Sequence, residues 1–152
     1  MDYGELEGEL ASLGAQLLLK TIGALKNGLL KPIRQDHEKA TYAHRLQRED
    51  ESINWNLDAK TIHNQVRALC PLPGAYTEFQ GEPVKIYRTR IVNNEEIGNA
   101  GQILAVTKTG LLVQTGQGLL EILEMQKPGR KRMKALDCWQ GLRLNPGIIL
   151  PN

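Results

Sequence analysis

Residues 3–28 carry an apolar side chain at every third or fourth position, the spacing of one helix face. Asp2 is a suitable N-cap, Glu5 completes a capping box, and Asn27-Gly28 is a stop signal. Gly14 costs a helix about 1 kcal/mol relative to alanine, which suggests close packing at that point. The pattern predicts one long amphipathic helix, whose stripe needs a partner surface: Leu6, Leu10, Leu13, Leu17, Ile22 and Leu25.

Residues 30–50 lose this periodicity and are mostly polar or charged. Pro32 prevents a simple continuation of the first helix, because its ring blocks the helical hydrogen bond. We expect an extended linker here that runs over a surface, with Tyr42 as its only large anchor.

A second helix is predicted over residues 58–69. Asp58 is its cap, the inner face is apolar, and two prolines follow the last turn. The inner face consists of Ile62, Val66 and Leu69.

From residue 75 the apolar period changes from that of a helix to that of a strand. Glycine stands at nearly every turn between these short runs, which is typical of a small closed or partly open β-barrel. The predicted strands cover residues 76–79, 84–88, 103–106, 111–114 and 119–123, followed by a helical turn near 135–141 and a strand over 146–150.

The composition changes this picture only through the distribution of charge. At 152 residues the chain has room for one domain and an appendage, and no apolar run is long enough to span a membrane. Residues 1–57 hold 7 basic and 9 acidic side chains, whereas residues 58–152 hold 12 and 8. Within residues 127–143 there are six basic groups and one acid, a density suited to a polyanion.

Several ordered blocks of this sequence resemble one family, the methionyl-tRNA formyltransferases. Residues 41–43 and 46–55 are similar to its linker and the start of its C-terminal domain, and residues 62–77 to the opening of that domain. Residues 126–133, with Gly141 and Asn145-Pro146-Gly147, match its closing stretch. Even residues 3–15 resemble the last helix of the family's catalytic domain. The departures from the pattern are His44, Asn54 and Lys134, and Lys134 replaces a short capping side chain.

The resemblance implies a mainly β fold with flanking helices: a small Greek-key, OB-like open β-barrel after a long amphipathic helix and an extended linker. Residues 1–29 would be a helix of the Rossmann-like catalytic domain, 30–50 the linker and 51–152 the barrel domain. The whole enzyme would transfer a formyl group from 10-formyltetrahydrofolate to methionyl-initiator tRNA in the cytoplasm. The family's catalytic Asn, His and Asp precede everything in this sequence, so the chain alone is predicted to be inactive, without a cofactor.

The candidate tRNA contacts are basic residues placed to meet phosphates, which position a nucleic acid without reading its sequence. The first set surrounds the turn-forming pair Pro128-Gly129 and consists of Lys127, Arg130, Lys131, Arg132 and Lys134. A second set on a predicted strand consists of Lys85, Arg88 and Arg90. Strict alternation would place Lys85 and Arg88 on opposite faces, so that only part of this set lines one groove.

Other chemistry receives a simpler interpretation. His63 lacks a positioned carboxylate and is expected to be a surface or hydrogen-bonded histidine. His37 and His44 have no neighbouring metal-ligand types. Cys70 and Cys138 are expected to be reduced, packed thiols, and residues 116–118 to form a hairpin turn.

Two alternatives to the tRNA-binding function remain open. One is the C-terminal barrel of another folate-dependent formyltransferase or hydrolase, for which the basic loop would be dispensable. The other is a structural module that only supports a catalytic domain. The expected partners are initiator methionyl-tRNA, the preceding catalytic domain and, through the uncovered helix 3–28, a second copy of the chain.

Overall fold

The computed structural model describes residues 1–93, 97–142 and 146–151. The chain divides into two compact units. One, here called the barrel unit, contains Met1–Tyr3 and Gln47–Asn152. The other, the helix–linker unit, contains Gly4–Leu46.

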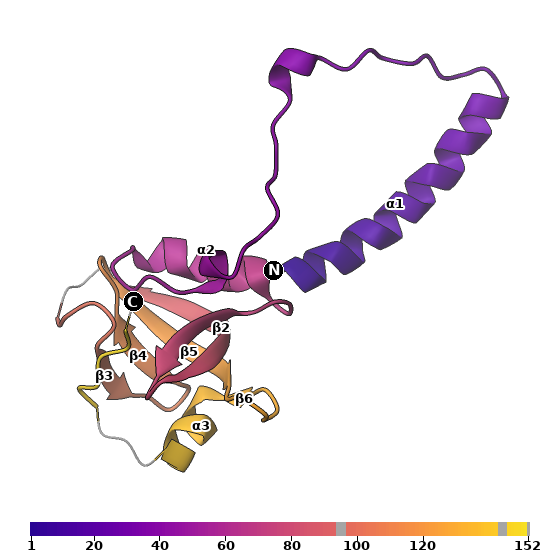
Figure 1. The fold of residues 1–152 in the computed structure, drawn as a ribbon. Coiled ribbons are helices and arrows are strands. Elements are labelled where there is room, and N and C mark those ends of the chain that lie inside the picture. Colours follow the sequence, from indigo (N-terminus) through magenta and orange to yellow (C-terminus); the bar gives the residue numbers. More distant parts are fainter. Residues whose placement is uncertain (94–96, 143–145, 152) are drawn as a thin grey trace. The chain divides into compact units, whose positions relative to one another are not determined.

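Helix α1 spans Tyr3–Lys26 and confirms the predicted first helix. The helix, seen in Figure 1, is closed after Lys26 by Gly28, where φ is +66°, and the N–H of Leu29 donates to the carbonyl of Ala24 at 3.0 Å. Glycine favours this left-handed position because it has no Cβ. None of the residues of α1 is buried, and Leu13 in its apolar stripe is 61% exposed.

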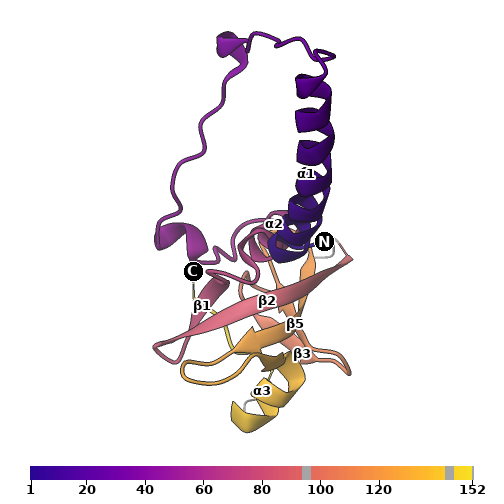
Figure 2. The ribbon, with the colours of Figure 1, turned by 90° about the vertical axis from the view of Figure 1, so that its right-hand side faces the viewer.

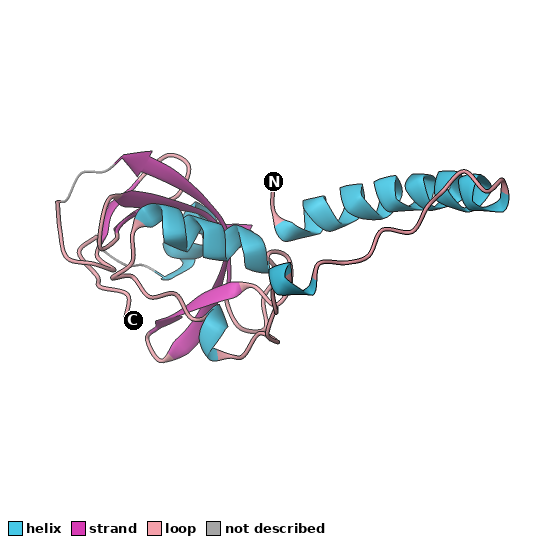
Figure 3. Cartoon of the chain, turned by 90° about the horizontal axis from the view of Figure 1, so that it is seen from above, coloured by secondary structure: helices cyan, strands magenta, loops and turns pink. Residues whose placement is uncertain are grey.

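The segment after α1 is extended apart from a short 3₁₀ turn, η1, at His37–Lys39 (Figure 3). The carboxylate of Asp36 caps this turn by accepting from the N–H of Glu38 at 3.1 Å. The expectation that Tyr42 anchors the linker is wrong, since Tyr42 is 88% exposed. The backbone around Tyr42 is extended, so the linker itself does not cover the ring.

Helix α2 spans Ala59–Leu69 and follows a second 3₁₀ turn, η2, at Glu49–Glu51. Its predicted cap is confirmed, because the Asp58 carboxylate accepts from the N–H of Thr61 at 2.9 Å. The predicted inner face of α2 is buried, and Ala59 joins it. Figures 1 and 2 show α2 at one end of the curved sheet and the last helix, α3 (Ala135–Leu142), at the other.

The described residues form a sheet of six antiparallel strands: β1 (Ala75–Phe79), β2 (Glu82–Asn93), β3 (Ile103–Val106), β4 (Leu111–Gln114), β5 (Leu119–Gln126) and β6 (Met133–Lys134). Strands β3, β4 and β5 form a meander, and the earlier strand β2 pairs with β5, which is a Greek key. The order β1-β2-β5-β4-β3 leaves β1 and β3 as edges of the described sheet, with β6 beside β5. The predicted fold, an open barrel that is mainly β, is thereby confirmed.

One feature completes the barrel differently from the prediction. The predicted strand over 146–150 forms only an isolated bridge, between Ile149 and Gln102. Around it, the N–H of Ile103 donates to the carbonyl of Ile148 at 2.8 Å, and the N–H of Leu150 donates to that of Gly101 at 2.9 Å. Residues 148–150, here called the clasp, therefore hold the start of β3 without forming a strand, because their pairing stops after one bridge.

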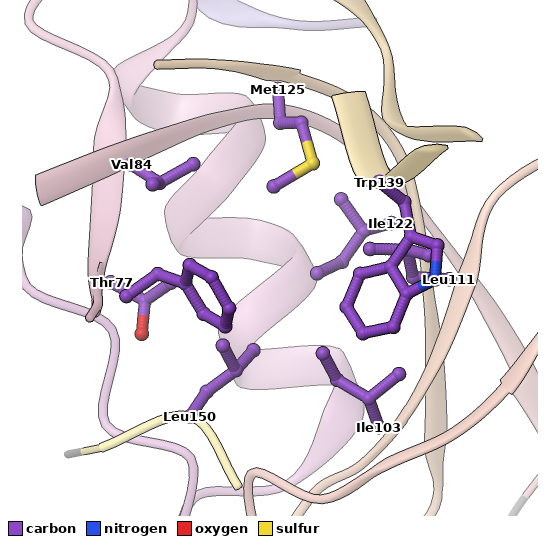
Figure 4. A pocket seen from close by; sticks show the side chains of 9 residues that line it. Thr77, Val84, Ile103, Leu111, Ile122, Met125, Trp139 and Leu150 are labelled. Atoms are coloured by element: carbon purple, nitrogen blue, oxygen red, sulfur yellow. The ribbon is translucent and has the colours of Figure 1, made fainter. Parts of the chain in front are cut away.

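The interior of the barrel is apolar. Figure 4 shows side chains from the sheet, from α3 and from the clasp around one small space. Met125, Ile103 and Leu150 are among the residues that line it. The indole N–H of Trp55, which is fully buried, donates to the hydroxyl of Thr77 at 3.0 Å. This packed interior offers few polar groups to a ligand, so a functional site must be sought on the outer surface.

Candidate functional site

A bulge in β2 brings two of the predicted basic residues onto one face. Lys85 pairs with Gln126 and Arg88 with Glu124, so their partners on β5 are two residues apart, with a register shift between them. Tyr87 is the extra residue at this bulge and is buried. The expectation that Lys85 and Arg88 point to opposite faces is wrong, because an extra residue reverses the alternation of a strand.

The predicted basic loop is a tight turn between β5 and β6. The N–H of Arg130 donates to the carbonyl of Lys127 at 3.1 Å, and Gly129 has φ +67°. Proline and then glycine at the two central positions are the preferred residues of a type II turn. Arg130 and Lys131 are exposed here.

One open hollow, called the first hollow, lies beside this turn. Arg48, Lys85 and Lys127 contribute to its lining together with Pro83, Gln126, Pro128 and Gly129. No carboxylate belongs to this described lining, so three cations face one small volume. Such an arrangement favours an anion with several oxygen acceptors, such as a phosphate.

Arg48 is a member of the first hollow that the sequence pattern did not single out. Its guanidinium lies 4.3 Å from the ring centroid of Tyr76 and 2.7 Å from a carboxylate oxygen of Glu51. The ammonium of Lys85 donates to the carbonyl of Pro73. These contacts fix two of the three cations before any ligand arrives, which reduces the entropy lost on binding.

A second hollow lies on the same face of β2 and β5. Its cations are Arg88, Lys134 and Lys108, and Lys108 comes from the turn between β3 and β4. Glu124 and Asp137 also line this hollow, along with Thr109, Leu123 and Leu136. The two carboxylates offset most of the positive charge, so the second hollow is the weaker candidate for an anion.

Three of the predicted contacts pair with carboxylates. Arg132 pairs with Glu124 at 2.5 Å, and Arg90 pairs with Glu121 at 2.5 Å. Arg88 is also near Glu124, at 3.8 Å, but its side chain is 68% exposed. The eight predicted residues therefore do not form one uniform patch.

Glu121 is a buried carboxylate on β5, only 1% exposed. Burial by itself raises its pKa, but hydrogen bonds from Thr107, Thr109 and Arg90 outweigh burial and hold the pKa below the ordinary value. The Thr109 hydroxyl donates to Glu121 at 2.6 Å. This cluster links the β3–β4 turn to β5. Arg90 therefore already has a buried carboxylate partner within the barrel, which makes it a weaker candidate for a phosphate contact.

The remaining candidates agree with their simpler interpretations. Nδ1 of His63 lies 2.9 Å from the hydroxyl of Thr89, and burial lowers the pKa of His63. Cys70 and Cys138 are buried free thiols, and burial raises the pKa of both. Residues 116–118 form a turn in which the N–H of Thr115 donates to the carbonyl of Gly118 at 3.1 Å.

In residues 1–93, 97–142 and 146–151, no three His, Cys, Asp or Glu side chains gather as metal ligands. None of the helices described is both long and apolar enough to cross a membrane.

The fold and the surface together define the class: an OB-like open β-barrel module that carries two basic hollows on its outer face. Residues 45–143 match the family model described as formyl transferase, C-terminal domain. The chain belongs to this family.

Known relatives agree with that assignment. The chain is 43% identical to the methionyl-tRNA formyltransferase of Syntrophomonas wolfei over 151 residues, which is 99% of this chain and 48% of the relative. It is 45% identical to that of Solibacter usitatus over 140 residues, 92% of this chain and 44% of the relative. The chain thus spans about half the length of these curated relatives.

A solved structure shares the fold at low identity. HypX from Aquifex aeolicus, in complex with tetrahydrofolic acid, superposes with a TM-score of 0.64 at 18% identity, over 90% of this chain and 26% of that one.

Proposed function

We propose that this chain is the tRNA-binding C-terminal part of a methionyl-tRNA formyltransferase. The whole protein would transfer a formyl group from 10-formyltetrahydrofolate to methionyl-initiator tRNA in the cytoplasm, at the start of translation. The observation that carries the proposal is the first hollow, where Arg48, Lys85 and Lys127 converge in a lining without a carboxylate among its described residues. Its geometry suits the phosphate backbone of an RNA strand.

Under this proposal the barrel binds the tRNA backbone, and a catalytic domain outside this chain carries out the formyl transfer. The reacting amine lies at the end of a long polyanion, so holding the backbone beside the active site lowers the entropic cost of positioning it. Contacts to phosphates carry no direct sequence information, and we expect weak binding with little preference for the initiator.

Salt-dependent tRNA binding tests the proposal. If about four phosphates are neutralised, log affinity falls against log salt with a slope of about −3 to −4. The double variant Lys85→Gln and Lys127→Gln is expected to reduce the slope by about two, because each lost cation releases one fewer counterion. Lys60→Gln is the matched control, since Lys60 is exposed at the start of α2 and lines neither hollow. Binding that is absent at low salt, or that ignores salt, would contradict the proposal.

The alternative barrel from another folate-dependent formyltransferase is separated by the substrate. In a full-length protein, charge reversal at Lys127 and Arg130 should impair formylation of methionyl-tRNA strongly. A formyltransferase that acts on a sugar nucleotide or on folate itself should keep its activity.

The helix–linker unit supports a second part of the proposal. The apolar stripe of α1 is exposed within this chain, and the curated relatives are about twice as long as the chain. We propose that residues 1–29 pack on the catalytic domain, that 30–50 is the linker and that 51–152 is the tRNA-binding domain. Light scattering of the chain alone should detect self-association through α1, which Leu10→Lys with Leu17→Lys should abolish. A strict monomer would count against a hydrophobic docking face.

A further inference from the structure

Arg132 differs from its neighbours Arg130 and Lys131 in its contacts, although its own side chain is still 39% exposed. Its guanidinium lies 2.5 Å from Glu124 and 4.8 Å from the ring centroid of Tyr87. One of its nitrogens is also 3.7 Å from the sulfur of Cys70. A carboxylate, an aromatic face and a thiol therefore occupy three sides of this group.

The Tyr87 ring connects Arg132 to the basic turn. The Tyr87 hydroxyl donates to the side-chain oxygen of Gln126 at 2.7 Å. The amide nitrogen of Gln126 then donates to the backbone carbonyl of Arg130 at 2.6 Å. This chain of contacts runs from the Arg132 guanidinium to the backbone of the turn that carries Lys127 and Arg130.

We infer that Arg132 is a positioning residue that holds the β5–β6 turn in place and does not itself contact a phosphate. A planar guanidinium suits this role, because its face can lie over the Tyr87 ring while its edge bonds to Glu124. Gln126 and Lys127 both line the first hollow, so the same contacts set the shape of that hollow. The inference rests on the proposed tRNA function and assigns different roles to three adjacent basic residues.

Because these contacts lie within the protein, their effect on the rigidity of the turn can be measured without RNA. Hydrogen exchange of the Arg130 amide, which donates to the Lys127 carbonyl, reports the opening of the turn. Arg132→Gln and Tyr87→Phe should each speed this exchange several-fold. Lys131→Gln, which changes the next residue along, should leave it unchanged.

The salt dependence of tRNA binding supplies the second measurement. Arg132→Gln should lower affinity several-fold while the slope stays at the wild-type value, because no phosphate contact is lost. Arg130→Gln should reduce the slope by about one. Arg132→Lys keeps the charge but cannot stack and bond in one plane, and we expect it not to restore slow exchange.

The two ideas fail in different ways. If the unaltered chain shows no salt-dependent tRNA binding, the proposed function fails, and the exchange experiment still tests the turn. If tRNA binds but Arg132→Gln reduces the slope by about one and leaves Arg130 exchange unchanged, Arg132 is a phosphate contact and the inference is overturned. Rescue of slow exchange by Arg132→Lys would also overturn it.

Discussion

The barrel unit and the helix–linker unit both contain regular apolar periodicity, and the structure uses it differently in each. Ile62 and Val66 on α2 are buried, whereas Leu13 and Leu17 on α1 are each 61% exposed. The moderate exposure of Ile22, at 43%, still leaves it outside any core. Periodicity therefore specifies that a helix forms, while the neighbouring polypeptide decides whether its apolar face is covered.

The largest expected difference comes from truncating one large side chain to alanine in each unit. Trp55→Ala removes a fully buried indole and its bond to Thr77, and we expect a loss of about 3–5 kcal/mol in the free energy of unfolding of the barrel. Leu13→Ala in α1 should change that free energy by less than about 0.5 kcal/mol. Urea denaturation followed by Trp fluorescence measures both. A comparable loss for Leu13→Ala would show that α1 contributes to the same cooperative unit.

Two glycines give a comparison of intermediate size. A Cβ at Gly116 would lie 1.9 Å from the carbonyl oxygen of Asn56, so Gly116→Ala forces the backbone apart and should cost about 1–3 kcal/mol. A Cβ at Gly14 has no neighbour within 4 Å, so the close packing that the sequence suggested there is absent from this chain. Gly14→Ala should raise helicity by circular dichroism, since alanine is favoured by about 1 kcal/mol. A loss of helicity would mean that the helix packs at Gly14 after all.

The smallest effect concerns pH and belongs to the barrel alone. Burial, with the charges of Arg67 and the amino terminus, lowers the pKa of His63, so the unfolded chain binds the proton more readily. The contribution is complete above about pH 6.5 and is lost as pH falls toward the folded pKa, with a slope of at most about 1.4 kcal/mol per pH unit. The slope should stay well below this limit, because the ring is partly exposed. His63→Gln should flatten the decline between pH 7 and pH 5.5, and an unchanged decline would point to other groups.

Much of the fold is predictable because local signals agree with it. Asp58 and the Ile62–Leu69 spacing define α2, and the Gln80-Gly81 pair, with φ +53° and +79°, defines the β1–β2 turn. Even Cys70 and Cys138 match the expectation of buried reduced thiols.

The candidate site is less predictable, because long-range packing sets its shape. The bulge at Tyr87 moves Arg88 to the same face as Lys85, and no glycine or other turn-forming residue in this part of the strand predicts the bulge. Arg48 lines the first hollow and lies over the ring of Tyr76, a contact between residues far apart in sequence that no local pattern predicts. Glu121 did leave a signal: a carboxylate inside the apolar run Leu119–Leu123 predicts a buried partner, which turns out to be Arg90 with Thr107 and Thr109.

The clasp at residues 148–150 has a kinetic consequence. It bonds to Gly101 and Ile103, and beyond it the carbonyl of Pro151 accepts from the hydroxyl of Thr77, 74 residues earlier. Contacts at such separations must wait for large loops to close, which slows folding to the millisecond-to-second range, whereas α1 gains its structure in about a microsecond. The barrel should therefore be the last part of this chain to reach its native state.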